Sequence, residues 1–150
     1  MAGEVWKEFE HNRVTHSAAH HLIAIAELRE KHGYARVSDV ARALNITRGS
    51  ASLTLKALKQ RGLVLEDENR FLMLSGEGDA LAAAVRGKKF LIRRFLDEVL
   101  GVSAEHAEID ACKIEHLVSD QTAHQLVKFL RFIRSGHASV APLLVWKRIW

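Results

Sequence analysis

Cys112, Glu115 and His116 fall within one short stretch of the chain and carry three side-chain types that bind transition metals. Residues three and four positions apart lie on one face of a helix, so the thiolate, the carboxylate and the imidazole can converge on one ion. A short match of this kind also arises by chance. The pair Cys112 and His116 also suggests a nucleophile with its base, but no Gly-rich phosphate loop or triad motif accompanies it. The spacing therefore favours metal binding over catalysis, with a chance match as the remaining alternative.

An earlier segment offers a fourth ligand. His20 follows His16 by one helical turn in a predicted helix over residues 15–31, whose apolar face carries Leu22 and Ile25. His20 would then point toward a partner helix. The alternative is that His20, beside apolar residues, is a hydrogen-bonded core histidine.

Cys112 is the only cysteine, so the chain has no internal disulfide. Its thiol is a small buried hydrophobe, a reactive group or a metal ligand. A second regulatory alternative follows, in which oxidation of Cys112 changes the activity of the protein without any ion. Replacement of Glu115 separates the two, because it removes a metal response and leaves thiol oxidation intact.

Positive charge is concentrated in the first half of the chain. Residues 35–64 contain six Arg or Lys residues against one acidic residue, whereas the whole chain has a net charge of +4. A concentrated basic segment suits binding to a phosphate backbone, although a solvated helix face has the same composition. The 48% hydrophobic and 27% charged residues are typical of a folded globular protein.

The pattern of the same segment predicts a helix, a tight turn, a second helix and a hairpin, which is the order of a winged helix-turn-helix. Ser38 is the predicted N-cap of a helix over residues 39–44, and Asn45 and Ile46 connect it to a recognition helix over residues 47–61. Two strands around a polar turn follow, over residues 63–66 and 70–74. The candidate DNA-binding residues are Arg36, Ser38, Thr47, Arg48, Ser50, Ser52 and Lys56. Among them Arg48 is the best candidate for reading bases. A winged helix that serves only as a protein-interaction module is the alternative.

Helices make up the rest of the pattern. They are expected over residues 77–100, with Gly87 as a weak point and Gly101 as the stop, and then over residues 103–112 and 119–135. Their apolar residues suit a homodimer, with a monomer core as the alternative. Trp146 and Trp150, in an apolar tail, either pack across the dimer or cover the end of the core. The predicted fold class is mainly α with a small β-hairpin. A winged helix-turn-helix domain occupies residues 1–76, and a helical dimerisation and metal-sensing domain occupies residues 77–150.

Two runs of sequence resemble a known family. The run GYARVSDVA at residues 33–41 resembles the winged-helix segment of the manganese branch of the diphtheria toxin repressor family, and DACKIEHLVSD at residues 110–120 resembles the metal-ligand segment of its iron branch. The similarity extends over about residues 15–130. It implies that Cys112, Glu115 and His116 are metal ligands and that His20 stands where the family uses Met or Asp.

The resemblance also implies a departure. The family's second, ancillary metal site takes a His and, in the iron branch, a Glu from positions that are Lys89 and Arg93 here, and neither charged side chain can bind a metal. Glu108 occupies the position of another ancillary ligand. We therefore hypothesise that Lys89 or Arg93 pairs with Glu108 in place of a second cation, leaving one regulatory metal per subunit. The alternative is a surface salt bridge of little energetic consequence.

The expected protein is a cytoplasmic, non-enzymatic transcriptional regulator, a homodimer that reads a palindromic operator in double-stranded DNA and has no role at a membrane. A divalent transition metal activates it by fixing the spacing of two recognition helices, which suits a repressor of metal-uptake genes. One thiolate, one carboxylate and two imidazoles suit Fe²⁺, Zn²⁺ or Co²⁺ better than Mn²⁺, which prefers oxygen ligands. Fe²⁺ is the expected ion, with a Mn²⁺- or Zn²⁺-responsive regulator of the same family as the alternative.

Overall fold

The structure, a computed structural model, describes residues 14–135. Trp146 and Trp150 lie outside the described residues. The chain forms two compact units, one ending at Arg86 and the next beginning at Gly87, so the division falls within helix α5 (Gly76–Arg94). Within the described part of the chain, no helix combines the length and apolar character needed to span a membrane.

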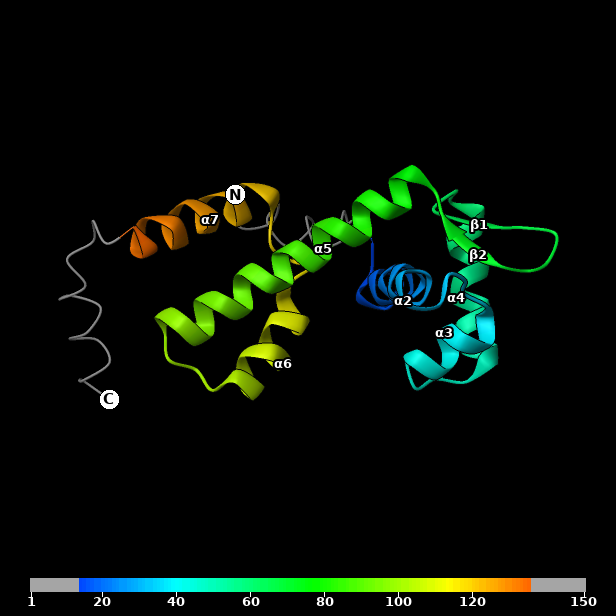
Figure 1. Cartoon of the computed structure of the whole chain (residues 1–150), viewed down its shortest axis with the longest axis horizontal. Coiled ribbons are helices and arrows are strands. Elements are labelled where there is room, and N and C mark those ends of the chain that lie inside the picture. The colour runs from blue at the N-terminus through cyan, green and yellow to red at the C-terminus, as the bar shows by residue number, and fades with distance from the viewer. Residues whose placement is uncertain (1–13, 136–150) are drawn as a thin grey trace, which may run out of the picture. The chain divides into compact units, whose positions relative to one another are not determined.

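The described part of the first unit, residues 14–86, consists of helices α2 (His16–His32), α3 (Val37–Ala43) and α4 (Arg48–Gln60), a β-hairpin and the start of α5 (Figure 1). Helices α2, α3 and α4 precede strands β1 (Val64–Glu66) and β2 (Leu72–Leu74). The strands pair antiparallel, with Leu65 opposite Met73. The Leu72 amide also donates to the Ala35 carbonyl oxygen at 2.8 Å, which ties the hairpin to the entrance of α3. The order is that of a winged helix, as predicted.

Local signals in the sequence set the helix ends. Thr15 and Thr47 cap α2 and α4, because their hydroxyl oxygens accept the amides of Ala18 at 3.2 Å and Ser50 at 3.1 Å. Gly33, with φ of 81°, ends α2 in the left-handed conformation. Asn45 has a positive φ of 53° in the turn before α4.

The predicted N-cap of α3 was wrong. This helix begins at Val37 with Arg36 at the N-cap, two residues before the position that Ser38 would set. The reason is Asp39, whose carboxylate oxygen accepts the Arg36 amide at 3.2 Å and so fixes the first turn.

The core of the first unit lies where the helices meet the hairpin. Leu22 and Ile25 of α2 are fully buried, as predicted, and they pack with apolar residues from the other elements. Gly78 shows how tightly the start of α5 packs, because a Cβ there would lie 2.1 Å from the Leu63 carbonyl oxygen. The shared core fixes α4 relative to the hairpin. Its buried residues from α3, α4, the hairpin and the residue before the hairpin are Val40, Leu55, Leu58, Leu63, Val64 and Leu72.

The second unit is helical. α5 continues through Gly87 without a break and passes into a π-helical turn, η2 (Phe95–Val99), before Gly101 ends the segment with φ of 73°. The exposed Gly87 is a weak helix former, but its cost of about 1 kcal/mol does not break a long helix. Helices α6 (Ala104–Ile114) and α7 (Asp120–Arg134) follow, and α6 runs two residues farther than predicted.

Candidate metal centre and nucleic-acid surface

The carboxyl end of α6 positions Cys112 and Glu115. The Ser103 hydroxyl caps this helix, and the Glu115 amide donates to the Ala111 carbonyl oxygen at 2.9 Å. Glu115 therefore stays on the helical path although α6 ends at Ile114, and it lies about one turn beyond Cys112. His116 follows in the turn that leads to α7. The helical spacing expected for Cys112 and Glu115 as candidate ligands is present.

Burial is the largest influence on the pKa values of Cys112 and Glu115. The Glu115 side chain is 0% exposed, and this burial raises the pKa of its carboxyl group to about 7, against the opposing charge of Lys89. Cys112 is half-buried, and burial followed by the charge of Glu115 raises the pKa of its thiol. Both groups disfavour their anionic forms in the absence of a cation.

The donor set fits a divalent transition metal. A buried carboxylate costs free energy unless a positive charge compensates it, and a bound cation would supply that charge. One thiolate and one carboxylate a helical turn apart, with an imidazole directly after them, are borderline ligands of the kind that Fe²⁺, Co²⁺ and Zn²⁺ accept. The raised pKa of the Cys112 thiol also lowers the fraction of reactive thiolate near neutral pH.

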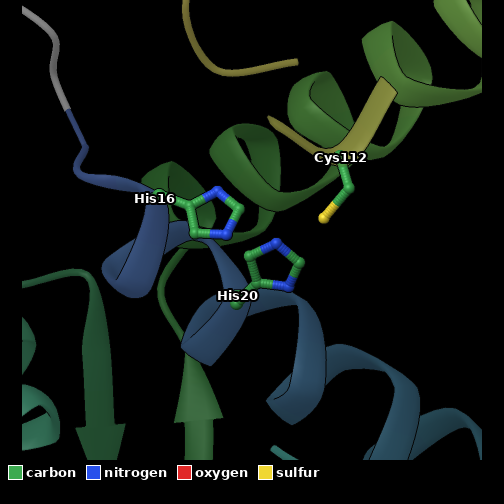
Figure 2. Close-up of side chains that lie close together, drawn as sticks. All are labelled: His16, His20 and Cys112. Carbon is green, nitrogen blue, oxygen red and sulfur yellow. The ribbon is translucent and has the colours of Figure 1, made fainter. Parts of the chain in front are cut away.

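Helix α2 presents two further histidines. His16 and His20 project from consecutive turns, and their ring centroids lie 4.4 Å apart (Figure 2). A nitrogen of His16 lies within 4.8 Å of a nitrogen of His20. His16 is exposed and His20 half-buried, whereas the neighbouring His21 is 2% exposed and its Nδ1 lies 2.7 Å from the Ser17 carbonyl oxygen. The core histidine of this helix is His21, and His20 is accessible to a ligand.

Lys89 of α5 reaches the same part of the second unit. Its Nζ lies 2.6 Å from Glu108 Oε1, and Arg93 Nε lies 3.7 Å from Glu108 Oε2. The hydrogen bond from Lys89 lowers the pKa of Glu108. Burial lowers the pKa of Lys89, but Glu108, together with Cys112 and Glu115, raises it by more. The hypothesised contact of Glu108 with a basic side chain is therefore present. The positive charge of Lys89 also favours the ionised forms of Cys112 and Glu115.

The candidate DNA surface lies entirely in the first unit. Arg36, Ser38, Arg48 and Ser52 line one hollow between α3, α4 and the hairpin. Thr47, Ser50 and Lys56 lie on or beside α4 and are exposed. The hollow also takes in two basic residues that the sequence did not single out, Lys59 and Arg70. Lys59 forms an ion pair with Glu66 of β1. No motif marks either residue, since their position depends on the fold of the hairpin against α4.

Comparisons with known proteins agree with this arrangement. The profile of the "Iron dependent repressor, metal binding and dimerisation domain" matches residues 75–138. The diphtheria toxin repressor of Corynebacterium jeikeium (strain K411) is 34% identical over 110 residues, which cover 73% of this chain and 46% of that protein. The diphtheria toxin repressor of Corynebacterium diphtheriae is 31% identical over 123 residues, covering 81% and 54%.

A solved structure, that of the manganese regulator SloR, superimposes with a TM-score of 0.70 at 30% identity, covering 77% of this chain and 54% of that one. The chain thus spans about half the length of the curated relatives that it matches. An aligned stretch of 110 or more of the 150 residues takes in parts of both units. The chain belongs to the family of the diphtheria toxin repressor and the manganese transport regulators.

Proposed function

We propose that this protein is a homodimeric DNA-binding transcriptional regulator, a repressor of metal-uptake genes, that is activated by one divalent transition metal per chain. The observation that carries the proposal is Glu115, a fully buried carboxyl group one helical turn from Cys112. A cation bound there would neutralise an acid that burial otherwise keeps partly protonated. The relatives that it matches are named as repressors and regulators, which supports a non-enzymatic role.

The proposed ligands are Cys112, Glu115 and His116 of the second unit with His20 of α2, and His16, one turn before His20, is a further candidate. A metal that joins the two units would restrict the recognition helix relative to the dimerisation half. That restriction is how metal binding would reach the DNA surface. The proposed ion is Fe²⁺, because a thiolate ligand with imidazoles suits it better than Mn²⁺. Mn²⁺ and Zn²⁺ are the alternatives.

For DNA, the proposed reader is α4, with Arg48 near its amino end as the base-reading residue and the hairpin beside the phosphate backbone. Arg36, Ser38, Thr47, Ser50, Ser52 and Lys56 would supply further contacts. The dimer is supported by large apolar side chains that the second unit leaves exposed, Phe90, Leu100, Phe129 and Phe132 among them. A two-fold dimer would read a palindrome.

The test is selection of bound DNA from a randomised duplex library by the reduced, chelator-treated protein, kept free of oxygen. The selection is run without metal and with Fe²⁺, Mn²⁺ or Zn²⁺. Enrichment of a palindrome only in the presence of a metal is expected, with Fe²⁺ effective at the lowest free concentration. Equal enrichment without metal would reduce Cys112, Glu115, His116 and His20 to structural residues.

We propose further that Lys89 takes the place of a second metal, since its ammonium already pairs with Glu108 at 2.6 Å. Titration calorimetry should then give one bound metal per chain. The double variant K89H/R93E adds an imidazole and a carboxylate next to Glu108 and should bind a second metal ion. The matched control K88H/R93E moves the imidazole to Lys88, which pairs with Asp120, and should still bind one. Two metals in the wild-type protein, or equal stoichiometry in both variants, would contradict this role.

A further inference from the structure

Arg70, in the loop of the hairpin, adopts a backbone conformation that residues with a Cβ atom rarely adopt. Its φ is 62°, in the left-handed region. The Arg70 amide donates to the Asp67 carbonyl oxygen at 3.0 Å, and the Asp67 amide donates to the Phe71 carbonyl oxygen at 3.0 Å. These bonds form a tight turn followed by one left-handed residue, a position that glycine fills in most hairpins of this type. An arginine there is strained, and Asn69, which tolerates this region better, stands one residue away.

Strain at one residue persists only where the surroundings hold it, and such positions concentrate at functional sites. The loop itself is held firmly. The Asp67 carboxylate accepts the amides of Asn69 at 2.9 Å and Phe71 at 2.8 Å, which fixes the turn around the strained position. The fold therefore keeps Arg70 in place, although nothing in the turn requires an arginine.

The charges around Arg70 leave its guanidinium available. Glu66 pairs with Lys59, and the Asp67 carboxylate accepts backbone amides. Within residues 14–135, Arg70 forms no side-chain hydrogen bond or ion pair, although it follows three acidic residues closely in the chain. Without Arg70 the hairpin loop would present mainly negative charge, which would repel a phosphate backbone.

Arg70 lines the same hollow as Arg48 and Ser52 of α4. The Arg36 guanidinium lies 4.6 Å from the centre of the Phe71 ring, and this contact holds Arg36 against the hairpin. Arg36 and Arg70 both line the hollow. This arrangement suits a polyanion that passes from α4 onto the hairpin.

We propose that Arg70 is a DNA-contact residue that binds a backbone phosphate beside the recognition helix, and that the hairpin keeps it there at a cost in stability. This inference rests on the proposed DNA-binding function. It predicts opposite effects of one substitution on stability and on binding. R70G relieves the strain and removes the contact, whereas R70K keeps both the charge and the strain.

The test uses the full chain loaded with Fe²⁺, a mixed-sequence DNA duplex and a series of salt concentrations. For R70G we expect a slope of log affinity against log salt that is shallower by about 0.9 per bound chain, with roughly tenfold weaker binding per chain at about 0.1 M salt. In the same protein without DNA, the melting temperature should rise by about 2–4 °C. R70K should retain most of the wild-type slope.

Two controls remove charge near the hollow and away from it. R42Q removes a positive charge from α3, where Arg42 pairs with Asp39 and lies outside the hollow, and it should leave the slope unchanged. E68Q removes a negative charge from the loop and should tighten binding. Equal slopes for wild-type and R70G would overturn the inference while the DNA-binding function stands. If the wild-type protein fails to bind the duplex at any salt concentration, the proposed function fails as well.

Discussion

Replacing Glu115 by glutamine is expected to abolish the response of DNA binding to metal while the protein stays folded. Glutamine keeps the shape of the side chain and removes the charge that would bind the ion. Loss of a hydrogen-bond partner behind a metal ligand typically weakens metal binding by about 10- to 100-fold, so loss of a ligand should exceed about a hundredfold. Metal affinity measured by competition with a chelating dye, and metal-dependent retention of an operator duplex, should both be lost.

The stability of the metal-free variant separates lost chemistry from lost folding. Burial raises the pKa of Glu115 to about 7, so the folded state holds this proton more tightly than the unfolded chain does. The charged carboxylate therefore costs stability as pH rises from the ordinary pKa of glutamate toward 7, and the full cost remains at higher pH. E115Q removes that cost, and thermal unfolding in a chelator at about pH 8 should show a melting temperature no lower than that of the wild-type protein.

E105Q is the matched control, because it makes the same change in the exposed first turn of α6 and should keep the full metal response. A metal-independent regulator that senses oxidants through Cys112 would behave differently. It would keep its DNA-binding response to peroxide in E115Q, and its DNA binding would ignore metal in both proteins. A wild-type metal affinity in E115Q would remove Glu115 from the ligand set.

The sequence predicted most of the first unit because its signals are local. Thr47 caps α4 through its own hydroxyl, and Asn45 adopts the positive φ that its short polar side chain tolerates. Ser38 failed as a cap for an equally local reason, since Asp39 competes for the same helix start. The left-handed Arg70 gave no signal, because an arginine at that position contradicts the preference from which turns are predicted.

In the second unit, spacing predicted the helical placement of two candidate ligands but not their surroundings. Cys112 and Glu115 follow the period of a helix, which can be read from the sequence. The complete burial of Glu115 could not be, because a glutamate in an amphipathic pattern is assigned to the surface. The contact of Lys89 with Glu108 joins α5 to α6, and without tertiary structure only the resemblance pointed to it.

Metal uptake is expected to depend steeply on pH, because the ion must displace protons from both acidic ligands. Burial raises the pKa of the Cys112 thiol above its ordinary value, so this group still carries a proton at pH 8. Glu115, with a pKa of about 7, carries one in most molecules at pH 6 and in few at pH 8. Binding to two protonated acids raises log affinity by about two per pH unit, and binding to one raises it by about one.

The expected metal affinity therefore rises roughly a hundredfold per pH unit below pH 7 and roughly tenfold per unit above it. Titration calorimetry in buffers of different ionisation enthalpy counts the protons directly. At about pH 8 the wild-type protein should release about one proton per metal, from Cys112, because Glu115 is already ionised.

C112S isolates that proton, since a serine hydroxyl does not ionise in this range. The variant should bind metal more weakly and release almost none at pH 8, while at pH 6 it should still release the Glu115 proton. E105Q should release as many protons as the wild-type protein at both pH values. If the wild-type protein and C112S release equal numbers at pH 8, the thiol is not a ligand and the ion is held by carboxylate and imidazole alone. Such a donor set would shift the preferred metal from Fe²⁺ toward Mn²⁺.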